Sequence, residues 1–202
     1  MKKLLYILLF TPVMSFSQSA FISGNELLCT NSRTADISVS FNGTAPFTFV
    51  YSINGINKAA IVTSINPFTI SSDIAGNYDL ISFSDAISVG TISGGAIITI
   101  LQAPTAVISN ITDTIHAIDP SLQFTSISIG NIINQTWNYG DNSGDEIIDD
   151  PIHNFPLNTA ALGVSSTYQI SLIVEDVNSC TDTTYKNIFV VNDYWMYIPN
   201  SF

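Results

Sequence analysis

Apolar and polar residues alternate along most of the chain. The clearest segments are 37–41, 47–51 and 168–174, in which every second residue is apolar or aromatic. A period of two places successive side chains on opposite faces of a β-strand. No stretch shows a sustained apolar stripe at helical spacing, so the pattern predicts an all-β fold.

Turn-forming residues separate these segments at intervals of about eight to twelve residues. They are Asn42-Gly43, Asn54-Gly55, Gly76-Asn77, Gly94-Gly95, Gly140-Asp141 and Asn142-Ser143-Gly144. Short strands at this spacing are typical of Greek-key sandwiches, and a chain of 202 residues is long enough for two. We therefore predict two tandem immunoglobulin-like (Greek-key) β-sandwiches.

The boundary between the two sandwiches is expected at Gln102-Ala103-Pro104. Residues 95–101 have the pattern of a closing strand and residues 106–109 that of an opening strand. Pro104 cannot donate a hydrogen bond to a strand ladder and so interrupts pairing between them. The predicted domains are therefore 18–102 and 103–192.

Residues 1–17 have the features of a signal peptide. A basic start at Lys2-Lys3 precedes an unbroken apolar run over 4–10, and Ser15-Phe16-Ser17 supplies small residues for cleavage before Gln18. The run is well short of the roughly 20 residues that span a bilayer, and no later segment qualifies. We expect an exported, secreted or cell-surface chain with no membrane span after cleavage.

The acidic composition narrows the choice of partners. The whole chain has a formal net charge of −11, and removal of the two leader lysines leaves three basic against 16 acidic residues, or −13. Such a surface repels phosphate, which excludes nucleic acid as a partner. With 46% hydrophobic residues the chain is not disordered. Other surface proteins or polysaccharides are the expected partners.

Two cysteines, Cys29 and Cys180, lie near opposite ends of the mature chain. Export permits a disulfide between them. Because their Cα atoms would have to approach within about 7 Å, such a bridge would require the two ends to fold back onto each other. We expect unpaired, partly buried thiols, with a disulfide as the alternative.

Three ordered motifs mark the second half of the chain. They are Trp137-Asn138-Tyr139-Gly140-Asp141, Asp150-Pro151-Ile152-His153-Asn154-Phe155 and Thr167-Tyr168-Gln169-Ile170-Ser171-Leu172, followed by Asn178-Ser179-Cys180-Thr181-Asp182. This half resembles a PKD domain, a sandwich module of extracellular proteins. The resemblance implies structural roles for Trp137, Gly140, Asp141, Pro151, His153 and Tyr168. It departs from the family pattern at residues 142–143 and in the long link 156–166.

The two halves share a tyrosine at a similar position. Tyr78 and Tyr168 each begin a late strand after a turn, an arrangement similar to the tyrosine corner of Greek-key sandwiches. Trp137, in contrast, lies mid-strand, so we expect it to fill the second core.

Shorter resemblances concern the first half and the last residues. Phe41–Phe47, Ala75–Tyr78, Ser84-Asp85 and Gly94–Ala96 resemble immunoglobulin-like repeats of large Bacteroidota surface proteins. Tyr197-Ile198-Pro199-Asn200-Ser201-Phe202 resembles the opening of the C-terminal sorting domain of gliding-motility-associated proteins. That resemblance implies type IX secretion, and residues 193–202 are predicted to begin a sorting domain that is either cut short in this sequence or lost.

An acidic loop is the strongest candidate site. Five carboxylates fall within ten residues: Asp141, Asp145, Glu146, Asp149 and Asp150. Oxygen ligands on a loop suit calcium, but their spacing does not fit an EF-hand. The alternative is a solvated turn, because charge runs are usually solvated. We expect no cofactor, with calcium as the alternative.

The sequence does not indicate catalysis. His116 and His153 are its two histidines, and no paired spacing for zinc accompanies them. No Gly-x-Ser-x-Gly nucleophile elbow is present. Asp113-Thr114-Ile115 and Asp182-Thr183-Thr184 fit an O-glycosylation pattern of Bacteroidota, which makes Thr114 and Thr183 candidate acceptors.

The expected function is that of a non-catalytic binding or spacer module in a cell-surface adhesin-like protein. An accessory module, binding carbohydrate or protein for a secreted degradative enzyme, is the alternative. An aromatic row on a flat sheet face would favour the accessory module, and a smooth polar face the spacer. A stand-alone hydrolase would need a deep pocket with a buried His–carboxylate pair. Fold alone does not decide among them.

Overall fold

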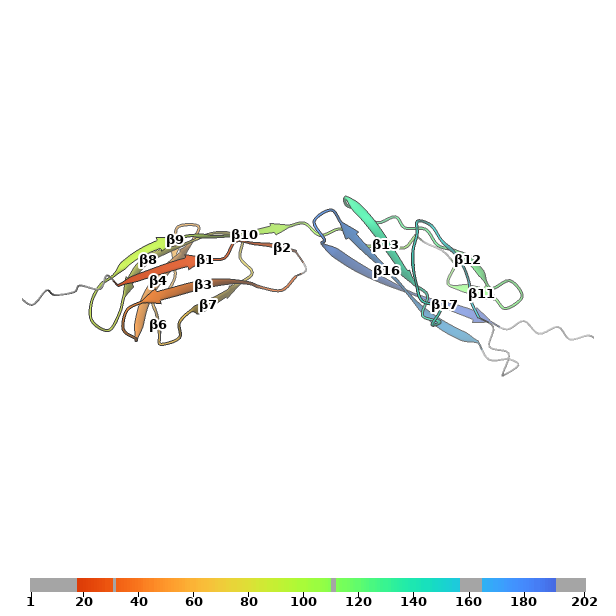
Figure 1. Cartoon of the computed structure of the whole chain (residues 1–202). Helices are drawn as coiled ribbons and strands as arrows, with labels where there is room; N and C mark the ends of the chain where they lie inside the picture. Colours follow the sequence, from red (N-terminus) through yellow and green to blue (C-terminus); the bar gives the residue numbers. More distant parts are fainter. Residues whose placement is uncertain (1–17, 31, 110–111, 157–164, 192–202) are drawn as a thin grey trace, which may run out of the picture. The chain divides into compact units, whose positions relative to one another are not determined.

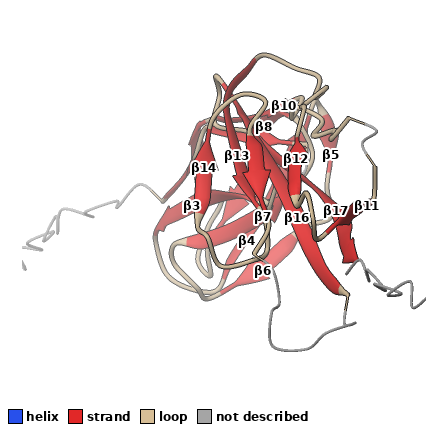
Figure 2. Ribbon diagram, turned by 90° about the vertical axis from the view of Figure 1, so that its right-hand side faces the viewer, coloured by secondary structure: helices blue, strands red, loops and turns tan. Residues whose placement is uncertain are grey.

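The computed structural model describes residues 18–30, 32–109, 112–156 and 165–191. These residues form strands, turns and loops, and no helix occurs among them (Figures 1 and 2). The predicted signal peptide and the predicted start of a sorting domain lie outside the described residues. Over the ranges given, the structure contains no helix long and apolar enough to cross a membrane. The prediction of an all-β fold is confirmed.

Seventeen strands make up the described chain. Those of the first half are β1 (Ser19–Ser23), β2 (Glu26–Cys29), β3 (Ala35–Asn42), β4 (Phe47–Ile53), β5 (Ile56–Asn57), β6 (Ile61–Thr63), β7 (Phe68–Ser72), β8 (Gly76–Ser84), β9 (Thr91–Gly94) and β10 (Ala96–Leu101). Those of the second half are β11 (Thr114–His116), β12 (Ser121–Gln123), β13 (Ile132–Asn138), β14 (Asp145–Ile147), β15 (Ile152–Asn154), β16 (Ser166–Asp176) and β17 (Thr181–Val191).

The described chain folds as two compact units. The first contains the described residues up to Leu28 together with Arg33–Ile100, and the second contains Cys29–Ser32 together with the described residues from Leu101 onward. The short segment 29–32 therefore belongs with the second unit, although the residues on both sides of it belong with the first.

The first unit is a sandwich of two sheets. One sheet has the order β7-β3-β1-β9, and the other has the order β2-β10-β8-β4-β5, with β6 also paired to β4. Phenylalanines fill the space between them: the ring centroids of Phe41 lie 4.6 Å from Phe47 and 5.6 Å from Phe83. The alternation seen in the sequence therefore sends every second side chain into one apolar core.

The last strand of the first unit changes sheets at Gly94-Gly95. β9 pairs with β1 in parallel, whereas β10 pairs with β8 in the opposite sheet. Gly94 has φ +84°, and a Cβ there would overlap the carbonyl oxygen of Ile22, so glycine is required. The predicted turn at Gly76-Asn77 is wrong, because these residues begin β8.

The second unit is also a sandwich. Its larger sheet has the order β11-β17-β16-β13-β14, and its smaller sheet pairs β12 with β15. Isolated bridges, Thr105 to Ile129 and Ile108 to Ser126, add an early segment beside the smaller sheet. Trp137 is fully buried between the sheets, with its ring centroid 5.5 Å from that of Phe124. Two immunoglobulin-like sandwiches in series are thus observed.

The expectation of unpaired thiols is wrong. Cys29 and Cys180 form a disulfide with a Cα–Cα distance of 5.6 Å, and no free cysteine occurs in the sequence that the structure describes. The ends of the chain need not fold back, because the tip of β2 belongs with the second unit. There the N–H of Thr30 donates to the carbonyl of Leu101 (2.9 Å), where the chain enters that unit. Distance along the sequence was a poor guide to distance in space.

Candidate functional site

The carboxylates of the acidic loop turn to different neighbours. Asp145 Oδ1 accepts a hydrogen bond from Asn138 Nδ2 (2.6 Å), and Asp149 Oδ1 accepts one from Gln135 Nε2 (3.0 Å). Each of these side chains is held by a residue of β13. The structure thus ties the loop to the neighbouring strand through its acids.

Asp150 and Glu146 also accept hydrogen bonds from residues outside the loop, in these cases from residues that are not part of β13. Asp150, which has φ +49°, accepts the N–H of Ser126 at Oδ1 (3.2 Å), and Glu146 Oε2 accepts the hydroxyl of Tyr139 (2.8 Å). No three histidine, cysteine, aspartate or glutamate side chains are grouped to hold a metal ion within the described ranges. The five calcium candidates are close in sequence, but the structure does not bring them together as a ligand set.

A histidine–carboxylate pair lies beneath the loop. His153 Nε2 is 2.7 Å from Asp141 Oδ2, and the two side chains are 10% and 2% exposed. The imidazole stacks on the ring of Tyr139, with centroids 3.7 Å apart and planes at 7°. Burial alone would raise the pKa of Asp141, but hydrogen bonds from Ser143 and His153 outweigh it and hold the pKa below its ordinary value.

The pair holds the loop in place, and the nearby hydroxyl of Ser143 bonds to the carboxylate and not to the imidazole. The hydroxyl of Ser143 donates to Asp141 Oδ1 (2.6 Å), and the imidazole reaches the other oxygen of the same carboxylate. A serine nucleophile would instead donate to the imidazole. Tyr139 is fully buried; burial, followed by its hydrogen bond to Glu146, raises the pKa of its phenol. This phenol therefore stays protonated as a hydrogen-bond donor.

The other residues implied by the PKD resemblance surround this pair. Gly140 has φ +70°, and a Cβ there would lie 2.5 Å from the carbonyl oxygen of Gln169. The carbonyl of Pro151 accepts the N–H of Phe124 (2.8 Å). The hydroxyl of Tyr168 donates to the carbonyl of Pro156 (3.0 Å), and its ring stacks on Phe155. Together they form one aromatic and polar cluster around the start of the loop.

The remaining candidates lie on the strands at one edge of the larger sheet. Thr114 begins β11 and is exposed, whereas Thr183 lies half-buried inside β17. His116 ends β11, and its carbonyl accepts the N–H of Asp119 (2.9 Å). Of the two glycosylation candidates, Thr114 is the more accessible.

The edge of β17 carries backbone groups beside which the described residues place no strand. The N–H of Phe189 donates to the Asp113 carbonyl (2.7 Å), away from β16, and β11 pairs with residues 189–191 alone. Backbone groups point alternately to the two sides of a strand. Thr183, Tyr185 and Asn187 therefore point their N–H and C=O groups the same way as Phe189. Within the described chain, these three residues make no backbone hydrogen bond on that side.

A groove of about 570 Å³ runs along this edge. Ala106, Val107 and Ile108 line one wall, and residues 184–187 with Phe189 line the other. The Ala106 N–H crosses to Asp182 Oδ2 (2.8 Å), whereas Val107 bonds away from the groove, to Ser128 and Ile127. By the same alternation, the N–H and C=O of Ile108 face the groove. Both walls therefore offer backbone partners to an extended segment.

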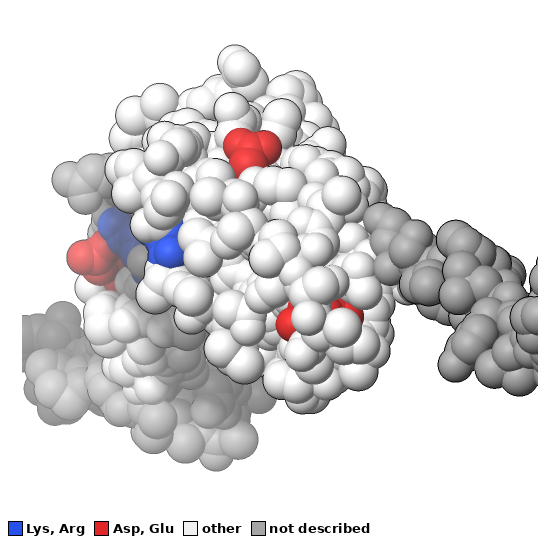
Figure 3. Space-filling model, turned by 90° about the vertical axis from the view of Figure 1, so that its left-hand side faces the viewer, with Lys and Arg blue, Asp and Glu red and all other residues white. Residues whose placement is uncertain are grey.

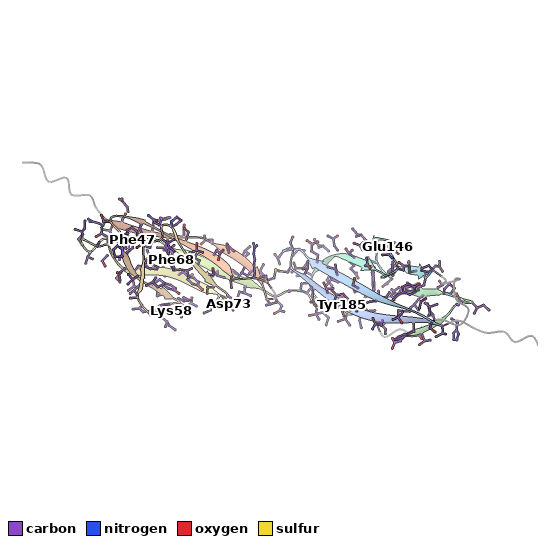
Figure 4. The ribbon with its side chains drawn as sticks, turned by 90° about the horizontal axis from the view of Figure 1, so that it is seen from below. Phe47, Lys58, Phe68, Asp73, Glu146 and Tyr185 are labelled. Atoms are coloured by element: carbon purple, nitrogen blue, oxygen red, sulfur yellow. A yellow bond between two sulfur atoms is a disulfide. The ribbon has the colours of Figure 1, made fainter. Side chains whose placement is uncertain are left out.

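The outer face of β17 carries two aromatic rings among uncharged residues. Tyr185 is 64% exposed (Figure 4) and Phe189 is 42% exposed. Their strand neighbours across the ladder are Ser171 and Thr167, both uncharged. Lys186, in contrast, faces the groove side, with its ammonium 2.8 Å from Asp113 Oδ1. Two rings four residues apart on one strand form a short aromatic row.

Charge is sparse over the described surface. On the face shown in Figure 3, a few acidic and basic side chains lie amid uncharged residues. The chain as a whole has 10% charged residues. Contacts through such a surface depend on backbone groups, hydroxyls, amides and rings more than on ion pairing.

Sequence reasoning did not identify the β17 edge, Tyr185 or Phe189. The sequence does contain a pattern that predicts the exposure of these two rings. Odd-numbered residues of 181–191 alternate with the apolar Ile188 and Val190, which are buried. Exposure of one face follows from that pattern, but the lack of a neighbouring strand does not, because it depends on where β11 stops.

Comparisons with known proteins give likenesses of fold. No family model and no curated protein matches the chain. Among solved structures, the PKD1 domain from Vibrio cholerae metalloprotease PrtV is 22% identical, covers 44% of this chain and 98% of its own, and has a TM-score of 0.34.

Two further structures match over a longer stretch. A Ca²⁺-stabilised adhesin that helps an Antarctic bacterium bind ice is 14% identical, with coverage of 88% of this chain and 50% of its own and a TM-score of 0.47. Fibronectin(III)-like modules of Clostridium thermocellum CbhA are 12% identical, with coverage of 89% and 99% and a TM-score of 0.41. These likenesses do not identify what this chain binds.

Proposed function

We propose that this chain is a non-catalytic, extracellular binding or spacer module of a cell-surface adhesin-like protein exported by type IX secretion. The observation that carries the proposal is the open edge of β17 beside its groove, since both walls present unpaired backbone groups. An extended segment of a surface protein would add to this edge as a further strand. No bond is made or broken in such binding.

Export is supported by the disulfide and by the ends of the sequence. Disulfides persist in oxidising compartments, and Cys29 and Cys180 are paired. We assign residues 1–17 to a cleaved signal peptide and residues 193–202 to the start of a sorting domain, on the sequence motifs given above. We assign residues 18–102 to an immunoglobulin-like domain and 103–192 to a PKD-like domain.

A second function, carbohydrate binding for a secreted degradative enzyme, is favoured by one observation. Tyr185 and Phe189 expose rings beside the uncharged neighbours Ser171 and Thr167, and aromatic side chains offer large apolar contact area with little entropy loss. This surface lies on the outer face of β17 rather than on its edge. The two functions therefore predict different sensitive residues.

Binding assays on matched variants separate the two. Asn187→Pro removes one edge N–H and blocks strand addition, whereas Tyr185→Ala with Phe189→Ala removes the rings. The probes are phage-displayed nonapeptides and soluble neutral polysaccharides. We expect the selected peptides to bind Asn187→Pro at least tenfold more weakly and the ring variant within about threefold of wild type. Polysaccharide binding that is lost in the ring variant alone would favour the accessory module instead.

The route of export has its own test. The gene downstream of the Phe202 codon is expected to continue in frame through Thr-Pro-Asn-Gly-Asp-Gly, and antibodies against residues 18–191 are expected to label intact cells. A stop codon directly after Phe202, or labelling that requires permeabilised cells, would contradict type IX export.

A further inference from the structure

The disulfide closes most of the described chain into one covalent loop. Cys29 and Cys180 are 151 positions apart, so residues 30–179 lie within the loop. Strands β3 to β16 fall inside it. Outside it the structure describes twelve residues on each side, 18–29 and 180–191, which contain β1, β2 and β17.

We propose that this bridge is a mechanical lock that carries load past both sandwiches. A pull applied before Cys29 and after Cys180 follows the shortest covalent path, through the sulfur–sulfur bond. The backbone of β3 to β16 is then not under tension, whatever the strength of its sheets. The biological source of the load rests on the proposed function, because a surface-anchored module is pulled when its partner moves away.

The residues outside the loop are already close to full extension. A strand rises about 3.3 Å per residue, and a chain reaches at most about 3.6 Å per residue. Since β1, β2 and β17 account for most of residues 18–29 and 180–191, tension has little slack to remove there. The locked chain therefore resists lengthening by its covalent geometry, without relying on the stability of either unit.

Both cysteines are fixed by local hydrogen bonds. Ser32 Oγ accepts the N–H of Cys29 (3.0 Å) and donates to its carbonyl (2.7 Å). At the other end, Asp176 Oδ1 accepts the N–H groups of Asn178 (2.8 Å) and Cys180 (2.9 Å). Asp176 and Cys180 are 5% and 1% exposed. Burial of Cys180 limits access of thiols to the bridge, as a load-bearing bond requires.

Single-molecule pulling tests the lock on the full chain held by tags at its two ends. In the absence of reductant, the 52 residues of the full chain outside the loop (202 − 150) can supply at most about 19 nm of chain. With dithiothreitol present, reduction of the bridge is expected to release the 150 enclosed residues, about 50 nm more, in the same molecule. The expected contrast in extension is about fourfold.

Two further measurements keep the lock falsifiable. The double variant Cys29→Ser with Cys180→Ser is expected to lengthen fully without reductant, and wild-type chain unfolded without reductant is expected to titrate no free thiol. If the variant does not fold, the reductant arm on wild type decides. Extension of unreduced wild type by about 50 nm, or two free thiols per chain, would overturn the proposal. Neither result depends on peptide or polysaccharide binding, so failure of the lock is distinguishable from failure of the proposed function.

Discussion

The two sandwiches treat the edge of their last strand differently. In the first unit the last strand breaks at Gly94-Gly95, and its second part, β10, lies between β8 and β2. In the second unit β17 runs unbroken from Thr181 to Val191, and only its end is covered by β11. Edge strands attract further strands unless they are covered. One fold thus covers both sides of β10 in one unit and leaves most of β17 with one open side in the other.

The cores differ as well. The first holds stacked phenylalanines, and its buried polar residues are the small Ser52 and Thr63. The second combines Trp137 with the buried ionisable side chains of His153 and Asp176. The first core depends mainly on packing, whereas the second also depends on the hydrogen bonds made by His153 and Asp176. The second unit is therefore the one with ionisable side chains in its interior as well as an open strand edge among the described residues.

The largest effect is expected from removing one large core ring in each unit. Trp137→Ala and Phe49→Ala each delete a fully buried side chain, and each should lower the free energy of unfolding of its own unit by about 3–5 kcal/mol. Hydrogen exchange with mass spectrometry locates the loss. Unchanged thermal stability of Trp137→Ala would contradict its place in the core, and loss of protection in both units would contradict their division.

The second largest loss of stability is expected at two glycines, one in each unit, that lie against a backbone carbonyl oxygen. Gly94→Ala and Gly140→Ala combine a left-handed backbone with overlap on a carbonyl oxygen, and we expect each to cost about 3 kcal/mol. Gly55→Ala and Gly144→Ala are the matched controls, because they have φ +77° and +97° with open space around the added Cβ. These should cost only about 1–2 kcal/mol in chemical denaturation. Equal costs in all four would show that backbone conformation alone decides.

A smaller effect, on the pH dependence of the free energy of unfolding, should distinguish the second unit from the first. The folded-state pKa of Asp141 lies below its ordinary value, so its contribution is fully present above about pH 4 and is lost as pH falls through that lower pKa. Asp141→Asn should cost the second unit about 1–3 kcal/mol at pH 7 and flatten its acid slope. Denaturation from pH 2 to pH 7 measures both. An unchanged slope in the variant would assign acid sensitivity to other carboxylates.

The smallest effect concerns the two tyrosines. The hydroxyl of Tyr78 donates to the Ile74 carbonyl (2.7 Å) four residues upstream, and Tyr78 is fully buried. Tyr168 reaches the Pro156 carbonyl from a half-buried position. Replacement by phenylalanine should cost about 1–1.5 kcal/mol at Tyr78 and about 0.5 kcal/mol at Tyr168. A larger loss at Tyr168, seen in thermal melts, would reverse the ranking.

The features that could be predicted from the sequence are those that depend on residues close together along the chain. Alternation is local, so it identified β3, β4 and β16 and hence the all-β fold. The Asn54-Gly55 turn was equally readable, because both residues have the positive φ that a tight hairpin requires. Motif resemblance singled out Asp141 and His153, which the structure places 2.7 Å apart.

The long-range features were not readable in the same way. The pairing of Cys29 with Cys180 depends on segment 29–32 belonging with the second unit, which no local pattern encodes. The open edge of β17 depends on β11 covering three residues and no more. The interpretation of the acidic loop as a candidate calcium site failed for a related reason. Proximity along the chain does not determine the hydrogen-bond partner of each carboxylate. Asp149, for example, accepts a hydrogen bond from Gln135 of β13.

The wide spacing of the two cysteines also orders events during biosynthesis. At about 5–20 residues per second, Cys29 is made roughly 8–30 s before Cys180, so its thiol long lacks its native partner. The turn that holds Cys180 forms between β16 and β17, two of the last strands to be synthesised. The bridge can therefore form only after nearly the whole chain has been made. Closure of the covalent loop is thus a late event in the synthesis of the chain.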